Sequence, residues 1–275
     1  MIIAICGLGL IGGSFAKAIK ANTSHTVYGF DKDGRATDAA LKCGAIDRAI
    51  TEEDFCKADL TLVCLFSRPT VDFILHTEFK ESSVVADICG VKRFIVESVD
   101  DAMKARGIRY VGTHPMAGRE CSGFSSSLPD LYKGASYIIT ETANTDESAV
   151  KELTDLALSI GFGEIVRTTP EDHDASIAFT SQLAHVVSNA YIKSPTLKRE
   201  RGFSAGSFLD LTRVAKLDET MWAPLFMENR ENLIFELDHI SARIAEYNDA
   251  LKNGDEDKLR ELLRDGRILK EQSLK

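Results

Sequence analysis

The opening stretch of the chain constrains its fold more than any other. An apolar run, residues 2–6, ends at Gly7, and Gly7, Gly9 and Gly12 fit the pattern G-x-G-x-x-G ahead of an amphipathic segment. This order is typical of a strand, a tight turn and a helix that bind the pyrophosphate of a dinucleotide. The first glycine allows the turn, the second lets the backbone approach the phosphates, and the third lets the helix pack on the strand. The phosphates would lie at the helix N-terminus, where free N–H groups attract anions.

An acidic residue supports the same interpretation. A second expected strand, residues 26–30, ends at Asp31, which lies 19 positions after Gly12. A carboxylate about 20 positions after the last glycine accepts hydrogen bonds from the adenosine ribose and disfavours a 2′-phosphate. The sequence therefore predicts a dinucleotide cofactor and favours NAD over NADP, although Lys32 and Arg35 are basic residues of the kind that hold a 2′-phosphate. The cofactor-binding residues expected here are Gly7, Leu8, Gly9, Leu10, Ile11, Gly12 and Asp31.

Strand and helix patterns alternate up to residue 168 and then give way to helical patterns alone. Continuous apolar strands such as residues 58–66 indicate a parallel sheet that is covered on both faces. We therefore expect an α/β domain with a doubly wound, Rossmann-type parallel sheet over residues 1–168, followed by an all-α domain over residues 169–275. Ligands of such sheets gather at the C-terminal ends of strands, so Ser67 and Arg68 are also expected to contact the cofactor.

Composition and charge exclude several classes of partner. The net charge is −9, and no basic block stands out, so we expect neither nucleic acid nor a membrane surface as a partner. The six cysteines show no C-x-x-C spacing, which predicts neither a metal site nor a disulfide framework. No run of about 18 apolar residues and no signal-peptide pattern is found, so a cytoplasmic location is expected.

Three polar side chains are candidates for chemistry. His114 follows an apolar strand at the C-terminal end of the sheet, where it can face a bound nicotinamide. His185 belongs to a long expected helix, residues 171–193, and is either a core histidine or a ligand of the substrate. That helix has an apolar face with Ile177, Ala184, Val187 and Tyr191 and a small, polar face with Asp174, Ala178, Ser181, His185 and Ser188. Arg213 lies among the apolar residues of a further expected helical segment, residues 202–214, and a buried arginine needs a carboxylate partner. That partner is either an acid of the chain, such as Asp210 or Glu120, or a carboxylate of the substrate.

Longer motifs link these residues and resemble the prephenate dehydrogenase family of tyrosine biosynthesis. The resemblance covers nearly the whole chain and combines the glycine pattern with several other segments. These segments are Asp87-x-x-x-Val91-Lys92, Thr113-His114-Pro115-Met116-Ala117-Gly118-x-Glu120, His173-Asp174, Ser181-x-Leu183-x-His185, and Asp210-x-Thr212-Arg213 with Trp222.

The resemblance implies an enzyme, a nicotinamide-dependent dehydrogenase that decarboxylates prephenate oxidatively to 4-hydroxyphenylpyruvate. It implies that His114 contacts the ring hydroxyl and takes its proton, and that Arg213 holds a carboxylate. It further implies that His185 and Ser181 bind the substrate and that Glu120 and Trp222 shape or gate the pocket. Arogenate, which carries an amino group in place of the side-chain ketone, is the alternative substrate.

The chain departs from the family pattern at three positions. Gly90 stands where a serine beside the ring hydroxyl is common, and Gln182 belongs to a segment where a further histidine is common. These two changes support a rival hypothesis, an NAD-binding sensor without catalytic activity, against which the presence of His114, His185 and Arg213 argues. Arg119 replaces a small hydroxyl residue and could add a positive charge for a dianionic substrate.

The helical part also predicts an assembly. Leu233, Leu237, Ile240, Ile244, Tyr247 and Leu251 follow alternating spacings of four and three residues. Such a seam requires another helix to cover it. We therefore expect a homodimer that forms through the helical domain, as the resemblance also implies.

Overall fold

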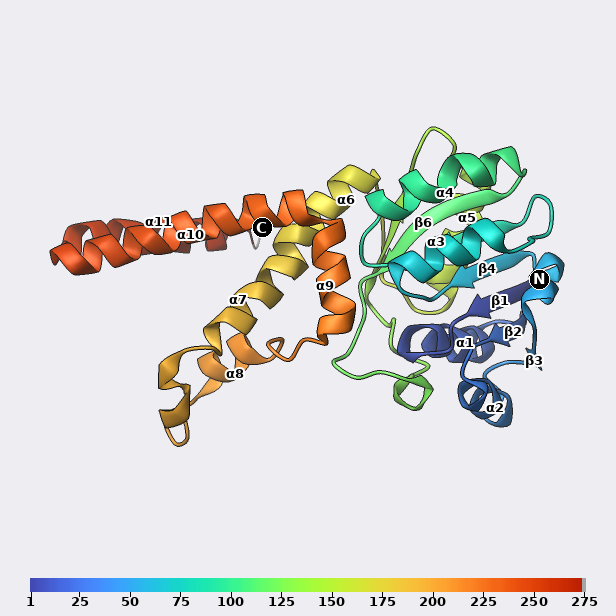
Figure 1. The fold of residues 1–275 in the computed structure, drawn as a ribbon, viewed down its shortest axis with the longest axis horizontal. Coiled ribbons are helices and arrows are strands. Elements are labelled where there is room, and N and C mark those ends of the chain that lie inside the picture. The colour runs from blue at the N-terminus through green and yellow to red at the C-terminus, as the bar shows by residue number, and fades with distance from the viewer. Residues whose placement is uncertain (274–275) are drawn as a thin grey trace.

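The computed structural model describes residues 1–273, which form a sheet flanked by helices and a group of helices beside it (Figure 1). The strands are β1 Ile2–Cys6, β2 Thr26–Phe30, β3 Arg48–Ala49, β4 Leu60–Val63, β5 Val84–Asp87, β6 Arg109–Pro115, β7 Ser136–Thr140 and β8 Glu164–Thr168. The helices that pack on the sheet are α1 Leu10–Asn22, α2 Gly34–Lys42, α3 Ser67–His76, α4 Arg93–Ala105 and α5 Glu147–Ser159. The remaining helices are α6 Pro170–Ile177, the π-helix η3 Ala178–Leu183, α7 Ala184–Tyr191, α8 Gly206–Thr212, α9 Glu219–Glu228, α10 Arg230–Asn253 and α11 Glu256–Gln272.

The sheet has the strand order β3-β2-β1-β4-β5-β6-β7-β8. Strand order reverses between β1 and β4, and ligands of open α/β sheets bind at such a switch point, beyond the C-terminal ends of the strands. The glycine-rich turn after β1 lies there, which confirms the expected Rossmann-type architecture.

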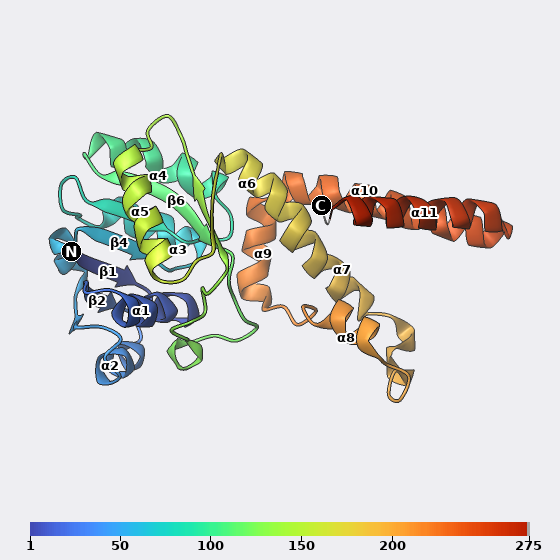
Figure 2. The same ribbon diagram turned by 180° about the vertical axis from the view of Figure 1, so that it is seen from behind.

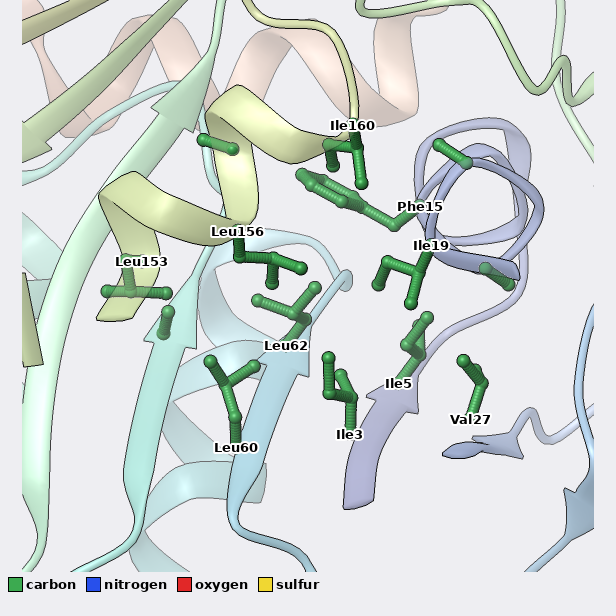
Figure 3. Close-up of a cluster of buried hydrophobic side chains, with 14 of the residues drawn as sticks. Ile3, Ile5, Phe15, Ile19, Val27, Leu60, Leu62, Leu153, Leu156 and Ile160 are labelled. Carbon is green, nitrogen blue, oxygen red and sulfur yellow. The ribbon is translucent and has the colours of Figure 1, made fainter. Parts of the chain in front are cut away.

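Alternating side chains of the strands build one hydrophobic core on each face of the sheet. Ile3 and Ile5 of β1 belong to the same core as Phe15 of α1 and Leu153 of α5 (Figure 3). The intervening residues, Ala4 and Cys6, point to the other face, which α3 and α4 cover. Figure 1 shows α3 and α4 in front of the sheet, and Figure 2 shows α5 from the opposite side. The strands are buried on both faces, which explains their continuous apolar sequence.

The expectation of an entirely parallel sheet is wrong at one edge. β7 pairs antiparallel to β6, and β8 is parallel to β7. The connection from β6 to β7 contains only a short 3₁₀ turn, Phe124–Ser126, in place of the crossover helix of a βαβ unit. β7 can therefore return beside β6 in the opposite direction.

The helical region begins directly after the sheet and extends away from it (Figure 1). β8 ends at Thr168, and Thr169 caps α6 by accepting a hydrogen bond from the Asp172 N–H. Helices α10 and α11 form a hairpin that projects from the rest of the molecule. None of the helices formed by residues 1–273 combines the length and apolar character needed to cross a membrane.

Candidate active site

The glycine-rich loop after β1 has the shape that a dinucleotide requires. Gly7 has φ +90°, and a Cβ atom there would lie 2.4 Å from the Cys64 carbonyl oxygen. A Cβ on Gly12 would lie 1.9 Å from the Gly7 carbonyl oxygen, so this glycine allows α1 to pack against the loop. A Cβ on Gly9 would meet no atom within 4 Å, so the backbone is open on this side. The three glycines thus have the three separate roles expected from the sequence.

The start of α1 presents backbone N–H groups to this open side. Gly9 is the N-cap residue, and no side chain caps the helix. Leu8 and Leu10 have buried side chains and Ile11 is half-buried, so what these residues can offer a ligand is mainly their backbone. Unpaired N–H groups at the first turn of a helix bind phosphate, so the loop fits a pyrophosphate.

Asp31 at the end of β2 connects the loop to a neighbouring cleft. Its carboxylate accepts hydrogen bonds from the Leu8 N–H at 2.7 Å and from the Asp33 N–H at 2.8 Å. The cleft has a volume of about 470 Å³, and its charged or titratable lining residues are Asp31, Lys32, Glu52, Glu53, Asp72, His76 and Glu78. Arg35 forms an ion pair with Asp33 at 2.9 Å. The excess of carboxylates would repel a 2′-phosphate, so the residues present fit NAD better than NADP.

The predicted cofactor residues Ser67 and Arg68 open α3, where they meet the helical region. Ser67 is buried, while Arg68 is largely exposed and lies 3.9 Å from a carboxylate oxygen of Glu228 in α9. The side chain of Glu228 is only 5% exposed, and neither of its oxygens has a well-formed hydrogen bond within the described part of the chain. Burial raises the pKa of Glu228, against the opposing effects of Ser67 and Arg68. Glu228 was not predicted as a site residue.

His114 lies within β6, which continues to Pro115 and is therefore longer than the strand expected from the sequence, residues 109–112. Desolvation lowers the pKa of His114 well below its usual value, and the nearby His173 and Lys92 add to this effect. The imidazole is therefore neutral near pH 7. A Cβ atom on Gly90 would lie 3.8 Å from the Nε2 atom of His114, so Gly90 leaves room beside that nitrogen.

A buried polar network holds the end of β6 beneath His114. Lys92 has a fully buried side chain that forms an ion pair with Asp87 and donates a hydrogen bond to the Thr113 carbonyl oxygen at 2.6 Å. Asp87 also accepts a hydrogen bond from the Tyr110 hydroxyl at 2.7 Å. A buried charge pair with its hydrogen bonds satisfied fixes the backbone on both sides of the strand ends. Asp87 and Lys92 thus hold the backbone next to His114 in place.

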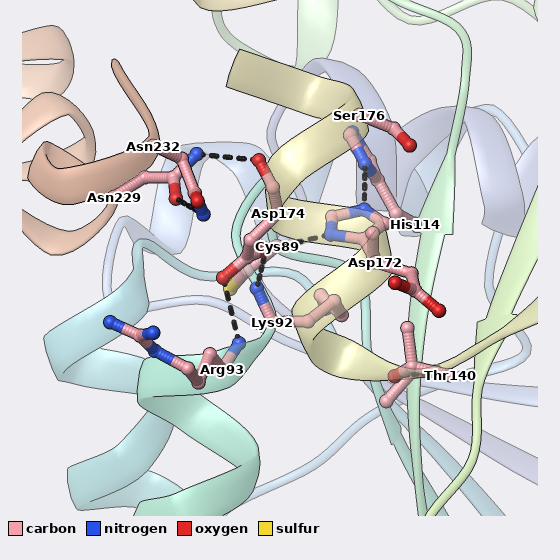
Figure 4. A network of polar contacts seen from close by, with 12 residues as sticks. Cys89, Lys92, Arg93, His114, Thr140, Asp172, Asp174, Ser176, Asn229 and Asn232 are labelled. Atoms are coloured by element: carbon pink, nitrogen blue, oxygen red, sulfur yellow. Dashed lines mark hydrogen bonds and ion pairs between the residues drawn. The ribbon is translucent and has the colours of Figure 1, made fainter. Parts of the chain in front are cut away.

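The helical region contributes the direct neighbours of His114 (Figure 4). The Nδ1 atom of His114 lies 2.9 Å from Nε2 of His173, whose Nδ1 lies 2.7 Å from Oδ1 of Asp174. The two oxygens of Asp174 also accept the backbone N–H groups of Lys92 and Arg93 at 2.8 and 2.9 Å, at the start of α4. A carboxylate at a helix N-terminus is stabilised by these groups and by the helix dipole.

The expected helix of residues 171–193 contains a π-helical turn, η3, which includes Ser181 and Gln182. Single π-turns within α-helices are frequent at functional sites. The Nδ1 atom of His185 hydrogen-bonds to the Ser181 carbonyl oxygen at 2.8 Å. Its ring lies against that of Trp222 in α9, with 4.1 Å between the ring centroids and an interplanar angle of 33°. His185, Ser181 and Trp222 therefore form one cluster at half-buried positions.

Gln182 has a structural contact that its sequence position did not reveal. Its side chain is buried, accepts a hydrogen bond from Asn229 at 2.8 Å and donates one to the Leu225 carbonyl oxygen at 3.3 Å. It therefore joins η3 to the end of α9. This contact accounts for Gln182 by packing and removes it as support for a sensor without activity.

The expectation that Arg213 is buried is wrong. Its side chain is 67% exposed and forms an ion pair with Glu120 at 2.5 Å, between the segment after α8 and the loop after β6. The expected helix of residues 202–214 is shorter, because α8 ends at Thr212. Arg119 is exposed beside Glu120. Because an exposed pair contributes only about 0–1 kcal/mol, a substrate carboxylate can compete with Glu120 for the guanidinium.

The predicted substrate residues thus form two groups of direct contacts, while His114 contacts His173. The first group is His185 with Ser181 and Trp222, and the second is Arg213 with Glu120. The sequence did not assign a role to His173 and Asp174. Their adjacent positions within one of the resembling motifs were the only signal available.

Comparisons with known proteins agree with the motifs. Residues 15–165 match the family model "Prephenate dehydrogenase, nucleotide-binding domain", and residues 169–265 match "Prephenate dehydrogenase, dimerization domain". The chain is 30% identical to prephenate dehydrogenase of Bacillus subtilis over 86% of its length, and spans 66% of that protein. It is 31% identical to cyclohexadienyl dehydrogenase of Zymomonas mobilis, with 94% of this chain and 91% of that protein covered.

A solved structure shows the same fold. The crystal structure of prephenate dehydrogenase from A. aeolicus in complex with hydroxyphenyl propionate and NAD+ matches with a TM-score of 0.88 and 29% identity. The match covers 99% of this chain and 98% of that one. The similarity therefore includes both the sheet and the helical region.

Proposed function

The chain belongs to the prephenate dehydrogenase family, and we propose that it catalyses the NAD-dependent oxidative decarboxylation of prephenate to 4-hydroxyphenylpyruvate in tyrosine biosynthesis. The observation that carries this proposal is the state of His114. It is a neutral imidazole at the end of β6 whose Nε2 atom has free space beside it at Gly90. A neutral histidine whose nitrogen borders such room is suited to accept a proton from a hydroxyl group.

We place the cofactor in the first domain, residues 1–168, and the closing and dimer-forming elements in the second, residues 169–275. The cofactor is NAD, which accepts the hydride from the ring carbon that carries the hydroxyl group. The open backbone at Gly9 and the first turn of α1 hold its pyrophosphate, and Asp31 accepts hydrogen bonds from its adenosine ribose. Ser67 and Arg68 border the same strand ends.

His114 moves one proton in each direction. Loss of a hydride and of carbon dioxide accounts for the whole difference between the substrate and the product. The proton that His114 takes from the ring hydroxyl is therefore returned to the ring oxygen once decarboxylation has made the ring aromatic. The residue acts as a base and then as an acid, which its neutral resting state permits.

The remaining residues bind and orient the substrate. Arg213 can exchange its partner Glu120 for a substrate carboxylate, because that pair is exposed. Arg119 places a second positive charge next to the same loop. His185 donates from Nδ1 to the Ser181 carbonyl oxygen, so its Nε2 is left as an acceptor toward the substrate, and Trp222 holds the ring in place.

One assay tests the proposal. We expect NADH to form, as measured by its absorbance, when the protein is mixed with NAD and prephenate. Prephenate and arogenate are to be tested separately, each with NAD and with NADP. Activity with arogenate alone would assign the alternative substrate, and no activity in any of the four combinations would favour the sensor.

The cofactor preference gives a first mutational prediction. Replacing Asp31 by serine is expected to weaken the binding of NAD. The ratio of kcat/KM with NADP to kcat/KM with NAD should rise by roughly 10- to 100-fold. The reason is that a hydrogen bond to a charged group contributes about 1.5–3 kcal/mol and that the repulsion of a 2′-phosphate falls. The measurement is kcat/KM for each cofactor. Asp38→Ser, on the exposed side of α2, is the control and should leave the ratio unchanged. An equal preference in the wild type and Asp31→Ser would contradict the assignment.

We also propose that the chain forms a homodimer through its helical domain. The seam expected to be buried is only partly covered in the single chain: Leu233 is buried, whereas Ile244 is 59% and Leu251 65% exposed. α11 covers α10 only in part, with a contact from the Tyr247 hydroxyl to the Leu262 carbonyl oxygen at 3.3 Å. Large apolar side chains exposed on these two helices include Ile234, Phe235, Ile244, Leu251, Leu263 and Leu269. Several large exposed apolar side chains on two paired helices indicate an interface.

Light scattering should therefore give the mass of two chains at micromolar concentration. The double substitution Ile244→Asp and Leu251→Asp is expected to produce a monomer, because it places charges in a desolvated interface. Leu41→Asp on α2, which is also an exposed apolar residue, is the control and should leave the dimer intact. A wild-type monomer would overturn the assignment of this surface.

A further inference from the structure

We propose that His173 and Asp174 are positioning residues that fix His114 in one tautomer, with the hydrogen on Nδ1 and the lone pair on Nε2. The inference rests on the proposed role of His114 as the base. It adds that the helical region determines which nitrogen of a residue in the sheet can accept the proton. The argument follows the hydrogen bonds from Asp174 to the open space at Gly90.

The order of hydrogen bonds is fixed by Asp174, which accepts all of those made by its carboxylate. Its carboxylate accepts two backbone N–H groups at the start of α4, and its side chain is only 2% exposed. An ionised carboxylate can only accept hydrogen bonds. The Nδ1 atom of His173, at 2.7 Å from Asp174 Oδ1, must therefore carry a hydrogen and donate it.

The hydrogen bonds also determine the tautomers of the two imidazoles. Desolvation is the main cause that lowers the pKa of His173, and that of His114 is lowered well below its usual value, so both rings are neutral near pH 7. A neutral imidazole has a hydrogen on one nitrogen only. Because His173 carries its hydrogen on Nδ1, its Nε2 is an acceptor, and His114 must donate from Nδ1 across 2.9 Å. The lone pair of His114 is therefore on Nε2.

The free nitrogen points to the place where the chemistry is expected. An added Cβ atom at Gly90 would lie 3.8 Å from Nε2 and 3.9 Å from Cε1 of His114, so this edge of the ring borders the room that Gly90 leaves. The other ring nitrogen, Nδ1, is occupied by its contact with His173. In the other tautomer, His114 would present an N–H group to the substrate hydroxyl and could not take its proton.

The charged groups around the two rings act in opposite directions on a positive charge. Lys92, whose ammonium group lies below the site, disfavours a positive charge on either ring. Asp174 and Asp87 act on His173 in the opposite sense. When His114 is protonated, its Nδ1–H still donates to His173, which donates in turn to Asp174. The carboxylate thus stabilises the charge that appears during turnover, through a neutral ring.

Two substitutions at His173 separate this role from simple packing. His173→Phe keeps a ring but removes the acceptor, and we expect kcat to fall by roughly 10²- to 10⁴-fold, as when the group that fixes the tautomer of a catalytic histidine is lost. His173→Gln can place an amide oxygen near the position of Nε2 and accept from His114. We expect it to recover part of the activity, so the order of kcat is wild type, then Gln, then Phe.

The direct measurement is NMR of protein labelled with ¹⁵N-histidine, which reports the nitrogen that carries the hydrogen in His114 without any turnover. We expect Nδ1–H in the wild type and in His173→Gln, and a shift toward Nε2–H in His173→Phe. Asn229→Leu is the matched control, because the Asn229 amide donates to the Asp174 backbone carbonyl and to Gln182, both at 2.8 Å, and not to an imidazole. It should lower the melting temperature and leave the tautomer unchanged.

The outcomes separate the two proposals. If His114 has the predicted tautomer and His173→Phe changes it, but no substrate is oxidised by the wild type, the proposed function is wrong and the positioning role stands. If the wild type is active but His114 carries its hydrogen on Nε2, the positioning role is wrong. The role is also overturned if His173→Phe leaves both the tautomer and kcat unchanged.

Discussion

Replacement of His114 by asparagine is expected to lower turnover by about 10²- to 10⁴-fold, the usual contribution of a general base. Asparagine keeps a hydrogen-bonding group but cannot accept the proton of the ring hydroxyl. The affinity for NAD should change little, because the glycine loop and Asp31, to which we assign the cofactor, follow other strands. The measurement is kcat together with NAD binding by titration. A variant with wild-type turnover would assign the base to another group, and His185 would be the next to test.

The pH dependence of the same pair of proteins sharpens this expectation. From the sequence, activity is expected to rise through a pKa near 6.5, the value of an unperturbed histidine. In the structure, desolvation and the nearby His173 and Lys92 lower the pKa of His114 well below that value. The base is therefore already neutral at pH 6.5, and activity is lost only as the pH falls further. We expect the acidic limb of kcat/KM to have its midpoint below 6.5 in the wild type and to be absent in His114→Asn.

Replacement of Arg213 by glutamine is expected to raise the KM for prephenate by roughly 10- to 100-fold, while the KM for NAD stays nearly constant. A hydrogen bond between charged groups contributes about 1.5–3 kcal/mol, and each tenfold change corresponds to about 1.4 kcal/mol. The expected loss is that of a bound carboxylate, since the pair with Glu120 is exposed in the single chain. Steady-state kinetics with each substrate varied in turn provide the measurement.

Two further variants distinguish a substrate-binding role of Arg213 from a structural one. Arg201→Gln removes an exposed arginine of the same helical region and should leave both constants unchanged. Glu120→Gln removes the acid that competes for the guanidinium, so it should not raise the KM for prephenate. If Arg213→Gln and Glu120→Gln both lower the melting temperature and neither changes a Michaelis constant, Arg213 has only a structural role.

The nucleotide-binding fold could be predicted from the sequence because its signals are local. The glycine pattern, the position of Asp31 and the continuous apolar strands each depend on a few neighbouring residues. The direction of β7 could not be predicted in this way. Its sequence is compatible with either direction, and the pairing with β6 depends on the course of the long connection between them.

The site was predictable where a residue type and a strand end coincide, as at His114. The partners of His114 were not, because His173 and Asp174 are separated from it by about sixty residues and meet it only when the two parts of the chain pack together. Arg213 shows the opposite error. Its apolar neighbours suggested burial, but Leu209 and Leu211 are themselves largely exposed in the single chain, so hydrophobic sequence context did not indicate the core.

The long helix after β8 illustrates a third limit. Its face of small and polar residues is the better-buried one, since Asp174, Ala178 and Ser188 are buried while Ala184 and Tyr191 are exposed. The π-turn η3 breaks the regular period on which the helical pattern relies. Burial in this part of the chain is also determined by hydrogen bonds, such as those of Asn229, and not by apolar character alone.

The most direct test of the central claim is the stoichiometry of the reaction with prephenate and NAD. We predict that the wild type releases one carbon dioxide for each NADH formed. In His114→Asn, the rates at which the two products form should fall by the same factor. This ratio follows because the oxidised ring becomes aromatic only by losing its carboxylate. Formation of NADH without carbon dioxide, or no NADH from prephenate or arogenate with either cofactor, would contradict the account.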